Sequence, residues 1–270
     1  MNSDVIKRLR EHSASIRAKR QDLSDALAQY ELILDAYEST PEVQVKPDPH
    51  IDLKAEPMAG LTALQIDWRQ SLDLFRRIKG ILNVKTDFPG DAETRDSHEA
   101  ELLERSFKAF AARAKDDIPA DKDVSPGMEL AAALTVRPLL RTIFSEARAG
   151  IDKESTSYKP RCPVCGARPV LSKITDPDGV RFLVCSVCEA EWPYQRLKCT
   201  ACGCSDHKKF EQLVADDDAV TALFLCNECE SYMKSIDTRG VESEFDALLY
   251  SIMTAHWDYI ASNRGYGSAS

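Results

Sequence analysis

Residues 162–229 contain the four motifs that decide the fold: Cys162-Pro-Val-Cys165, Cys185-Ser-Val-Cys188, Cys199-Thr-Ala-Cys202 and Cys226-Asn-Glu-Cys229. A tight turn that carries Cys-x-x-Cys can aim both sulfurs at one metal ion about 2.3 Å away, and two such turns complete a tetrahedron. The first two pairs are 19 residues apart and the last two are 23 apart, close to the known spacing of four-cysteine sites. The sequence therefore predicts two metal sites, whose ligands are Cys162, Cys165, Cys185, Cys188, Cys199, Cys202, Cys226 and Cys229.

Hairpin patterns between the pairs indicate which cysteines share a site. Residues 169–175 and 180–184 alternate like strands around a turn at 176–179, and residues 210–214 and 220–225 repeat this around 216–218. Each hairpin would return the chain to the pair before it. We therefore expect the first two pairs to form one site and the last two the other, rather than an interleaved arrangement.

The residue after each pair bears on how its turn closes. Gly166 and Gly203 follow the first and third pairs, where glycine tolerates a positive φ without a Cβ clash. Glu189 and Glu230 occupy the matching positions after the other two pairs. The sequence predicts that these two turns close differently.

The spacing leaves the identity of the metal open, because four sulfurs in a tetrahedron suit zinc and iron equally. Zinc would be structural and would supply about 10 kcal/mol of folding free energy per site, whereas iron would allow one-electron redox chemistry. Disulfides are disfavoured, because all nine cysteines fall within residues 162–229 of a long chain that starts without a recognisable export signal. Cys204, the ninth, is expected to be a free thiol and His207 a surface residue.

Helical spacing of apolar residues fills the rest of the chain. Helices are predicted over 4–38, 59–83, 97–115 with an N-cap at Ser97, and from Ser125-Pro126 to about 150 with a kink at Pro138. A proline-rich loop is expected over 39–57, and a last helix over 241–263. The predicted fold is α+β: a helical domain at 1–157, tandem rubredoxin-like or zinc-ribbon modules at 158–194 and 195–240, and a C-terminal helix and tail at 241–270.

Charge and composition narrow the function classes. The net charge of the 270 residues is −9, and residues 159–239 carry 11 Lys and Arg against 12 Asp and Glu, without the basic footprint of a nucleic-acid module. The chain starts without an export signal and lacks a run of about 18 apolar residues, so we expect a soluble, cytoplasmic protein with no membrane insertion and no nucleic-acid partner. Only one of five histidines lies among the cysteines. We expect no catalytic residues and no enzyme, and the sequence does not indicate an oligomeric state.

Four motifs resemble the bacterial FdhE family: Cys-Pro-Val-Cys-Gly at 162–166, Leu-Val-Cys-Ser-Val-Cys-Glu-Ala-Glu-Trp at 183–192, Arg-Leu-Lys-Cys-Thr-Ala-Cys-Gly at 196–203 and Cys-Asn-Glu-Cys-Glu-Ser-Tyr-Met-Lys-Ser-Ile-Asp at 226–237. The resemblance implies a cytoplasmic accessory factor that binds the catalytic (alpha) subunit of formate dehydrogenase and supports its maturation. It also implies two rubredoxin-type sites with one iron or zinc ion each, held by the eight matching cysteines.

The sequence is also compatible with two other functions: a rubredoxin-like electron-transfer protein and, less well, a nucleic-acid-binding zinc ribbon. A chaperone would present apolar surface beside a rigid frame, and four side chains flank the motifs as candidates: Trp192, Tyr194, Tyr232 and Met233. Packing of a small core around the sites explains the same four residues equally well.

Overall fold

The computed structural model describes residues 2–40, 66–86, 91–115, 121, 123–152, 159–175, 179–215, 218–241 and 243–268. Most of the predicted loop at 39–57, the start of the predicted helix at 59–83, and the centres of both predicted hairpin turns lie outside these residues. The chain forms two compact units, and along the described sequence the first ends at Glu146 and the second begins at Ala147.

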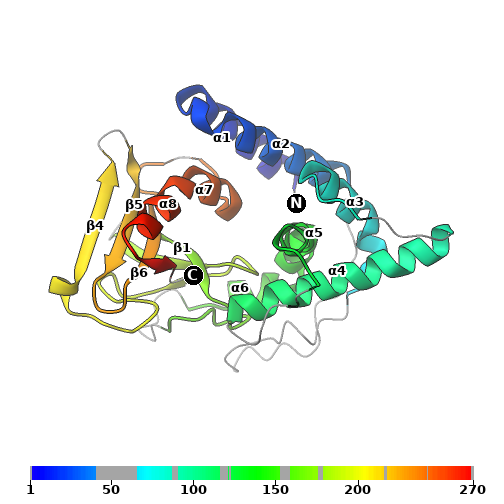
Figure 1. Ribbon diagram of the computed structural model, residues 1–270. Coiled ribbons are helices and arrows are strands. Elements are labelled where there is room, and N and C mark those ends of the chain that lie inside the picture. The colour runs from blue at the N-terminus through cyan, green and yellow to red at the C-terminus, as the bar shows by residue number, and fades with distance from the viewer. Residues whose placement is uncertain are drawn as a thin grey trace. The chain divides into compact units, whose positions relative to one another are not determined.

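The first unit is helical, as the sequence predicts. Its helices are α1 (Ser3–Lys19), α2 (Ser24–Ser39), α3 (Leu72–Ile81), α4 (Ala92–Lys115) and α5 (Pro126–Ile143), and α6 (Ser145–Ala149) continues into the second unit (Figure 1). Helix α5 contacts α3 and α4, and α2 contacts α1 and α3. Apolar side chains at helical spacing meet in the core of this unit, among them Ile6, Leu9, Leu27, Leu34, Phe75, Ile78, Leu103 and Phe107.

The prediction of one helix over 4–38 is wrong, because the chain breaks at Arg20 and forms a 3₁₀ turn at Gln21–Leu23. Helix α1 folds back to contact α2, and the fully buried Ser13 donates a hydrogen bond to Glu31 over 3.0 Å. The apolar repeat along 4–38 therefore reflects packing between two short helices.

The two predicted N-caps have different outcomes. Ser125 accepts a hydrogen bond from the backbone N–H of Met128 and caps α5, as expected. Ser97 lies inside α4, which begins at Ala92, and Asp91 accepts from the N–H of Thr94 in the first turn instead. Helix α5 continues through Pro138 and ends at Ile143.

In the described residues, the second unit is built on one sheet of seven strands. The strands are β1 (Pro169–Thr175), β2 (Val180–Cys185), β3 (Glu191–Pro193), β4 (Phe210–Ala215), β5 (Asp218–Cys226), β6 (Ser231–Asp237) and β7 (Gly267–Ser268). Six of them run in the order β3-β2-β1-β6-β5-β4, and β7 pairs with β6. The predicted hairpins are β1–β2 and β4–β5, both antiparallel. A parallel pairing of β1 with β6 joins them into one sheet.

The predicted C-terminal helix is two helices, α7 (Ala247–Met253) and α8 (Ala255–Asn263), with a break at Thr254. Helix α7 packs against β1 and α8 against β5 (Figure 1). Asp258 of α8 accepts hydrogen bonds from Tyr232 and Lys234 of β6, each over 2.8 Å. These contacts hold α8 against the strand that follows the fourth cysteine pair.

Within the described residues, the helices are all too short or too polar to cross a lipid bilayer.

Candidate metal centres

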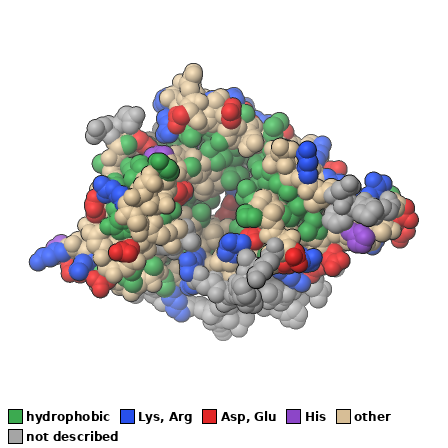
Figure 2. All heavy atoms as spheres, viewed as in Figure 1, with side chains coloured by type: hydrophobic (Ala, Val, Ile, Leu, Met, Phe, Trp, Pro, Cys, Tyr) green, Lys and Arg blue, Asp and Glu red, His purple; other side chains and the backbone are tan. Residues whose placement is uncertain are grey.

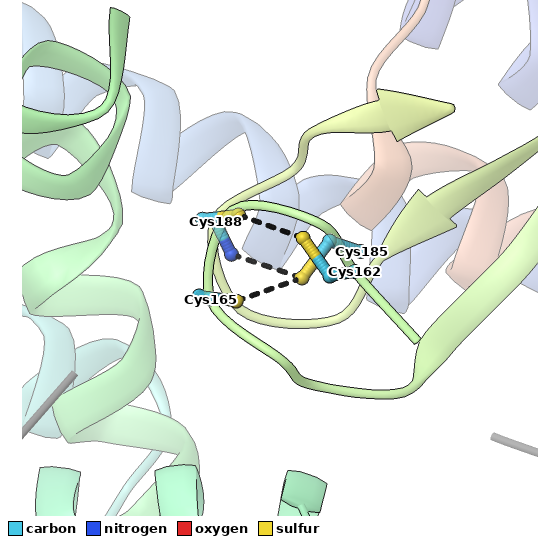
Figure 3. Close-up of side chains that lie close together, drawn as sticks. All are labelled: Cys162, Cys165, Cys185 and Cys188. Carbon is cyan, nitrogen blue, oxygen red and sulfur yellow. Dashed lines mark hydrogen bonds between the residues drawn. The ribbon is translucent and has the colours of Figure 1, made fainter. Parts of the chain in front are cut away.

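The first four cysteines come together at one end of the β1–β2 hairpin. Cys162 and Cys165 precede β1, Cys185 ends β2, and Cys188 lies in the turn toward β3. Their sulfurs point toward one another (Figure 3), with Sγ–Sγ distances of 3.6 Å for Cys162–Cys188 and 3.4 Å for Cys165–Cys185. A tetrahedron with metal–sulfur bonds of about 2.3 Å has edges of about 3.8 Å, whereas a disulfide bond is about 2.05 Å long. The spacing therefore fits four thiolates around one ion.

The second set has the same arrangement around the other hairpin. The Sγ–Sγ distance is 3.7 Å for Cys199–Cys229 and 3.8 Å for Cys202–Cys226. In each set the four sulfurs lie within 4.8 Å of one another. The structure thus groups the eight cysteines as the hairpin argument expects, while their ligation of a metal stays a prediction.

All four turns close in the same way, contrary to the expectation for the second and fourth. In three of them the backbone N–H of the first cysteine donates to the carbonyl five residues on, at 2.9 Å from Cys162 to Ala167, from Cys185 to Ala190 and from Cys199 to Cys204. In the fourth, Cys226 pairs with Ser231 across β5 and β6.

The backbone after each pair is left-handed whether or not glycine is there. The φ angle is 78° at Gly166 and 74° at Gly203, and it is 56° at Glu189 and 53° at Glu230. Two glutamates therefore adopt a conformation that disfavours a Cβ atom. The requirement of the turn prevails over the residue's own preference.

The two sets differ in burial. In the first set every cysteine is at most 2% exposed, whereas Cys202 and Cys229 of the second set reach the surface. The hydroxyl of Ser231 lies 3.3 Å from Cys199 Sγ and 3.1 Å from Cys229 Sγ. The second set is thus open to water and carries a hydroxyl contact to its sulfurs.

Burial and neighbouring groups shift the pKa values of these thiols. Burial raises the pKa of Cys162 and Cys188 well above the usual range, and raises that of Cys226 to about 12. At Cys199 burial acts in the same direction, but hydrogen bonds from Ser231 and from backbone N–H groups outweigh it, and the pKa is about 7. Adjacent buried thiols cannot all ionise without a compensating cation. A bound divalent ion would supply that charge.

The donor set fits the implied metal. Four thiolates are soft ligands at tetrahedral spacing, which suits zinc or iron, and backbone N–H groups of Val187 and Cys188 donate to Cys185 Sγ over 3.3 and 3.4 Å. Four cysteines fill every position of a tetrahedral ion. The arrangement can brace the hairpins or carry an electron, and it leaves no open position for a substrate.

The other candidates from the sequence have structural surroundings. Cys204 stands outside the second four-sulfur set, and its carbonyl closes the third turn. The side chain of His207 is 74% exposed. The four candidates for a docking surface, Trp192, Tyr194, Tyr232 and Met233, are all buried, which favours their role in packing.

Two residues around the second set, Ser231 and Arg181, are not singled out from the sequence, and Tyr194 is singled out only as a possible docking residue. Ser231 contacts two sulfurs, and Tyr194 donates its hydroxyl to the carbonyl of Cys199 over 3.0 Å. Arg181 is buried in β2, where its side chain reaches the carbonyl of Lys198. Arg181 could have been noticed as a cation within a run of strand residues.

Comparison with known proteins finds sequences similar to the part of the chain that contains these centres. Residues 161–196, which contain the whole first set, match the model described as the FdhE central domain. Over these residues the chain is similar to FdhE proteins. A protein FdhE homolog of Shewanella baltica strain OS185 is 33% identical over 122 residues, which are 44% of this chain and 40% of that protein. One of Enterobacter sp. strain 638 is 31% identical over 175 residues, 63% of this chain and 55% of that protein.

The fold extends the likeness beyond the cysteines. The crystal structure of the FdhE protein from Pseudomonas aeruginosa aligns with 99% of this chain and 94% of its own, with a TM-score of 0.71 at 20% sequence identity. This match shows a shared fold. The chain spans only 40% of the Shewanella baltica relative and 55% of the Enterobacter relative. The activities and partners of those proteins are therefore not assigned to this chain by the matches.

Replacing one cysteine of either set tests the ligand assignment. We expect Cys165→Ser and Cys202→Ser each to lower the metal content of the purified protein from about two equivalents to about one, because three thiolates and a hydroxyl bind more weakly than four thiolates. Cys204→Ser should retain both. Elemental analysis after purification with reductant and without chelator checks this. A Cys204→Ser protein that lost an ion, or a Cys165→Ser protein that kept two, would contradict the assignment.

The positive φ of Glu230 predicts that glycine substitutions at residues 230 and 228 change the free energy of unfolding in opposite directions. Glu230→Gly should stabilise the protein by up to about 1 kcal/mol, because glycine adopts a positive φ without steric cost. Glu228→Gly, two residues away and without a positive φ, should destabilise it by about 0.5–1 kcal/mol. Denaturant unfolding of the metal-loaded proteins gives both values. Equal signs for the two variants would show that φ at 230 does not limit stability.

The difference in burial predicts the order of metal loss. A chelator reaches an ion through its exposed ligands, so the second set should release its metal at least tenfold faster than the first, a rough figure for one exposed and one covered site. Release followed with a colorimetric chelator should be biphasic, with Cys202→Ser abolishing the fast phase. A fast phase that persists in Cys202→Ser and disappears in Cys165→Ser would reverse the order.

Proposed function

We propose that this chain is a cytoplasmic accessory factor, not an enzyme, that binds the catalytic subunit of formate dehydrogenase and supports its maturation. The two four-cysteine metal centres, one zinc or iron ion each, brace the sheet that presents the binding surface. The observation that carries the proposal is the FdhE family match over residues that form a complete four-cysteine set.

The chemistry of the centres supports a binding role. A fully ligated four-thiolate ion offers no position for a substrate or for activated water. It would instead fix the two turns of each set at the end of a hairpin. These properties suit a rigid frame for protein recognition.

The distribution of charge supports a protein partner over nucleic acid. On the face shown in Figure 2, Lys and Arg side chains are interspersed with Asp and Glu. Nucleic-acid modules concentrate basic residues into a patch or stripe. A mixed surface of this kind suits recognition of another protein.

Electron transfer is a second candidate, favoured by the surroundings of the second set. The hydroxyl of Ser231 and the N–H of Ala201 lie near its sulfurs, the latter 3.4 Å from Cys199 Sγ, and such contacts tune the potential of iron–sulfur centres. Red protein with reversible one-electron reduction would support this role. Colourless zinc protein would support the frame.

The proposal is tested in a bacterium that makes a respiratory formate dehydrogenase and lacks its own FdhE protein. We expect the tagged chain to restore formate oxidation and to co-purify the catalytic subunit, because docking depends on a sheet that the metal centres hold. Cys165→Ser should lose both effects, and Cys204→Ser should keep them. Enzyme assay of the cells and mass spectrometry of the purified complex give the two readouts.

Formate oxidation that is normal without any FdhE protein, or recovery of nucleic acid in place of the catalytic subunit, would overturn the proposal. Comparing transcript levels of the dehydrogenase genes separates maturation from expression.

A further inference from the structure

A small pocket lies beside the second cysteine set. Its wall includes Arg181 of β2, residues 198–200, Phe224 of β5 and the ligand candidates Cys199 and Cys226. The space has room for one or two water-sized groups. A ligand that enters it must therefore be small, or be a short group at the end of a larger molecule.

Three basic side chains, Arg181, Arg196 and Lys198, line the pocket, and among the described residues its lining contains no Asp or Glu. Within the described part of the chain, Arg196 and Lys198 have no ion-pair partner. Asp237 is close enough to Arg196 for the guanidinium to help lower its pKa, but its carboxylate is already bound by Arg239 over 2.6 Å. The pocket is therefore a positively charged recess.

Arg181 is 6% exposed, and its guanidinium carbon lies 5.6 Å from the ring centre of Tyr194 and 5.9 Å from that of Phe224. Its Nη1 donates to the carbonyl of Lys198 over 3.1 Å, while its Nε has no acceptor in the described structure. Burial lowers the pKa of Arg181 to about 10, so the side chain is still a cation at neutral pH.

A second donor in the same wall is also unused. The Oγ1 of Thr200, one residue after Cys199, is buried and has no hydrogen-bond partner among the described residues. Buried donors without acceptors are rare in native proteins. Two in one small pocket, together with three cations, point to an anionic acceptor.

The negative charge of the neighbouring metal centre would not replace an anionic acceptor in the pocket. Four thiolates with a divalent ion carry a net charge of −2, which is less than the three positive charges of the wall. Thiolates engaged with a metal also do not lie in hydrogen-bond contact with the Nε of Arg181 or the Oγ1 of Thr200. An oxygen anion would satisfy both donors.

We propose that this pocket binds a single carboxylate, supplied by a small acid or by an acidic side chain or C-terminus of a polypeptide. Lys198 and Arg196 attract the anion by charge, and Arg181 and Thr200 donate to its oxygens after a small side-chain adjustment, because both donor atoms are covered in the free protein. The inference does not depend on the proposed function.

Binding is measured on the full-length, zinc-loaded protein by calorimetry and by backbone amide NMR of residues 196–200, at constant ionic strength. The probes are sodium formate, sodium acetate, the capped peptide Gly-Asp-Glu-Gly and its uncharged counterpart Gly-Asn-Gln-Gly. We expect saturable binding of at least one carboxylate probe and none of the uncharged peptide. Binding of formate or acetate identifies a small acid as sufficient, and binding of the acidic peptide alone identifies a polypeptide source.

Variants locate the binding in the pocket. Arg196→Gln and Lys198→Gln should each weaken carboxylate binding by up to about fivefold, the effect expected of one exposed charge. Thr200→Val should weaken binding without a change of charge. Lys208→Gln, an exposed lysine outside the pocket, is the matched control and should change it less than twofold. Absence of saturable binding by every carboxylate probe, or equal weakening by Lys208→Gln, would overturn the proposal. Metal content and thermal unfolding of each variant confirm that the fold is intact.

Discussion

The second unit contains two sets of four cysteine sulfurs, and in each set the Sγ–Sγ distances are those of a tetrahedron around one metal ion. Bringing four thiols so close in apolar surroundings is unfavourable when they are neutral and more so when they are charged, since burial raises their pKa values. A divalent cation held by the four thiolates would reverse that balance, and its binding energy would become folding energy. The turns, the left-handed residues after them and the hairpins all serve this geometry.

The sequence predicts this part well because its determinants are local. The spacing of the pairs and the alternation of 169–175 and 180–184 contain enough information to group the cysteines and to locate the hairpins. The N-cap at Ser125 is predicted for the same reason, since the cap and the N–H that it accepts from are three residues apart.

Features that depend on distant contacts are not predicted. The chain turns at Arg20 and at Thr254 without glycine or proline, because α1 and α8 gain more by packing than a continuous helix would. Glu189 and Glu230 are in the left-handed region because the closed turn requires it, which their identity does not reveal. The recess beside Cys199 combines β2, β5 and the third turn, and no spacing rule connects those segments.

The parallel pairing of β1 with β6 connects the two centres through one continuous sheet. The strand that follows the first cysteine pair is hydrogen-bonded to the strand that follows the fourth. Residues 172–174 of β1 align with residues 235–237 of β6. Although the motifs look duplicated, separating residues before Gln195 from those after Tyr194 would leave β1 and β6 each with one unpaired edge. Unfolding of either half should therefore remove backbone pairing from the other, so that the two halves unfold as one cooperative unit.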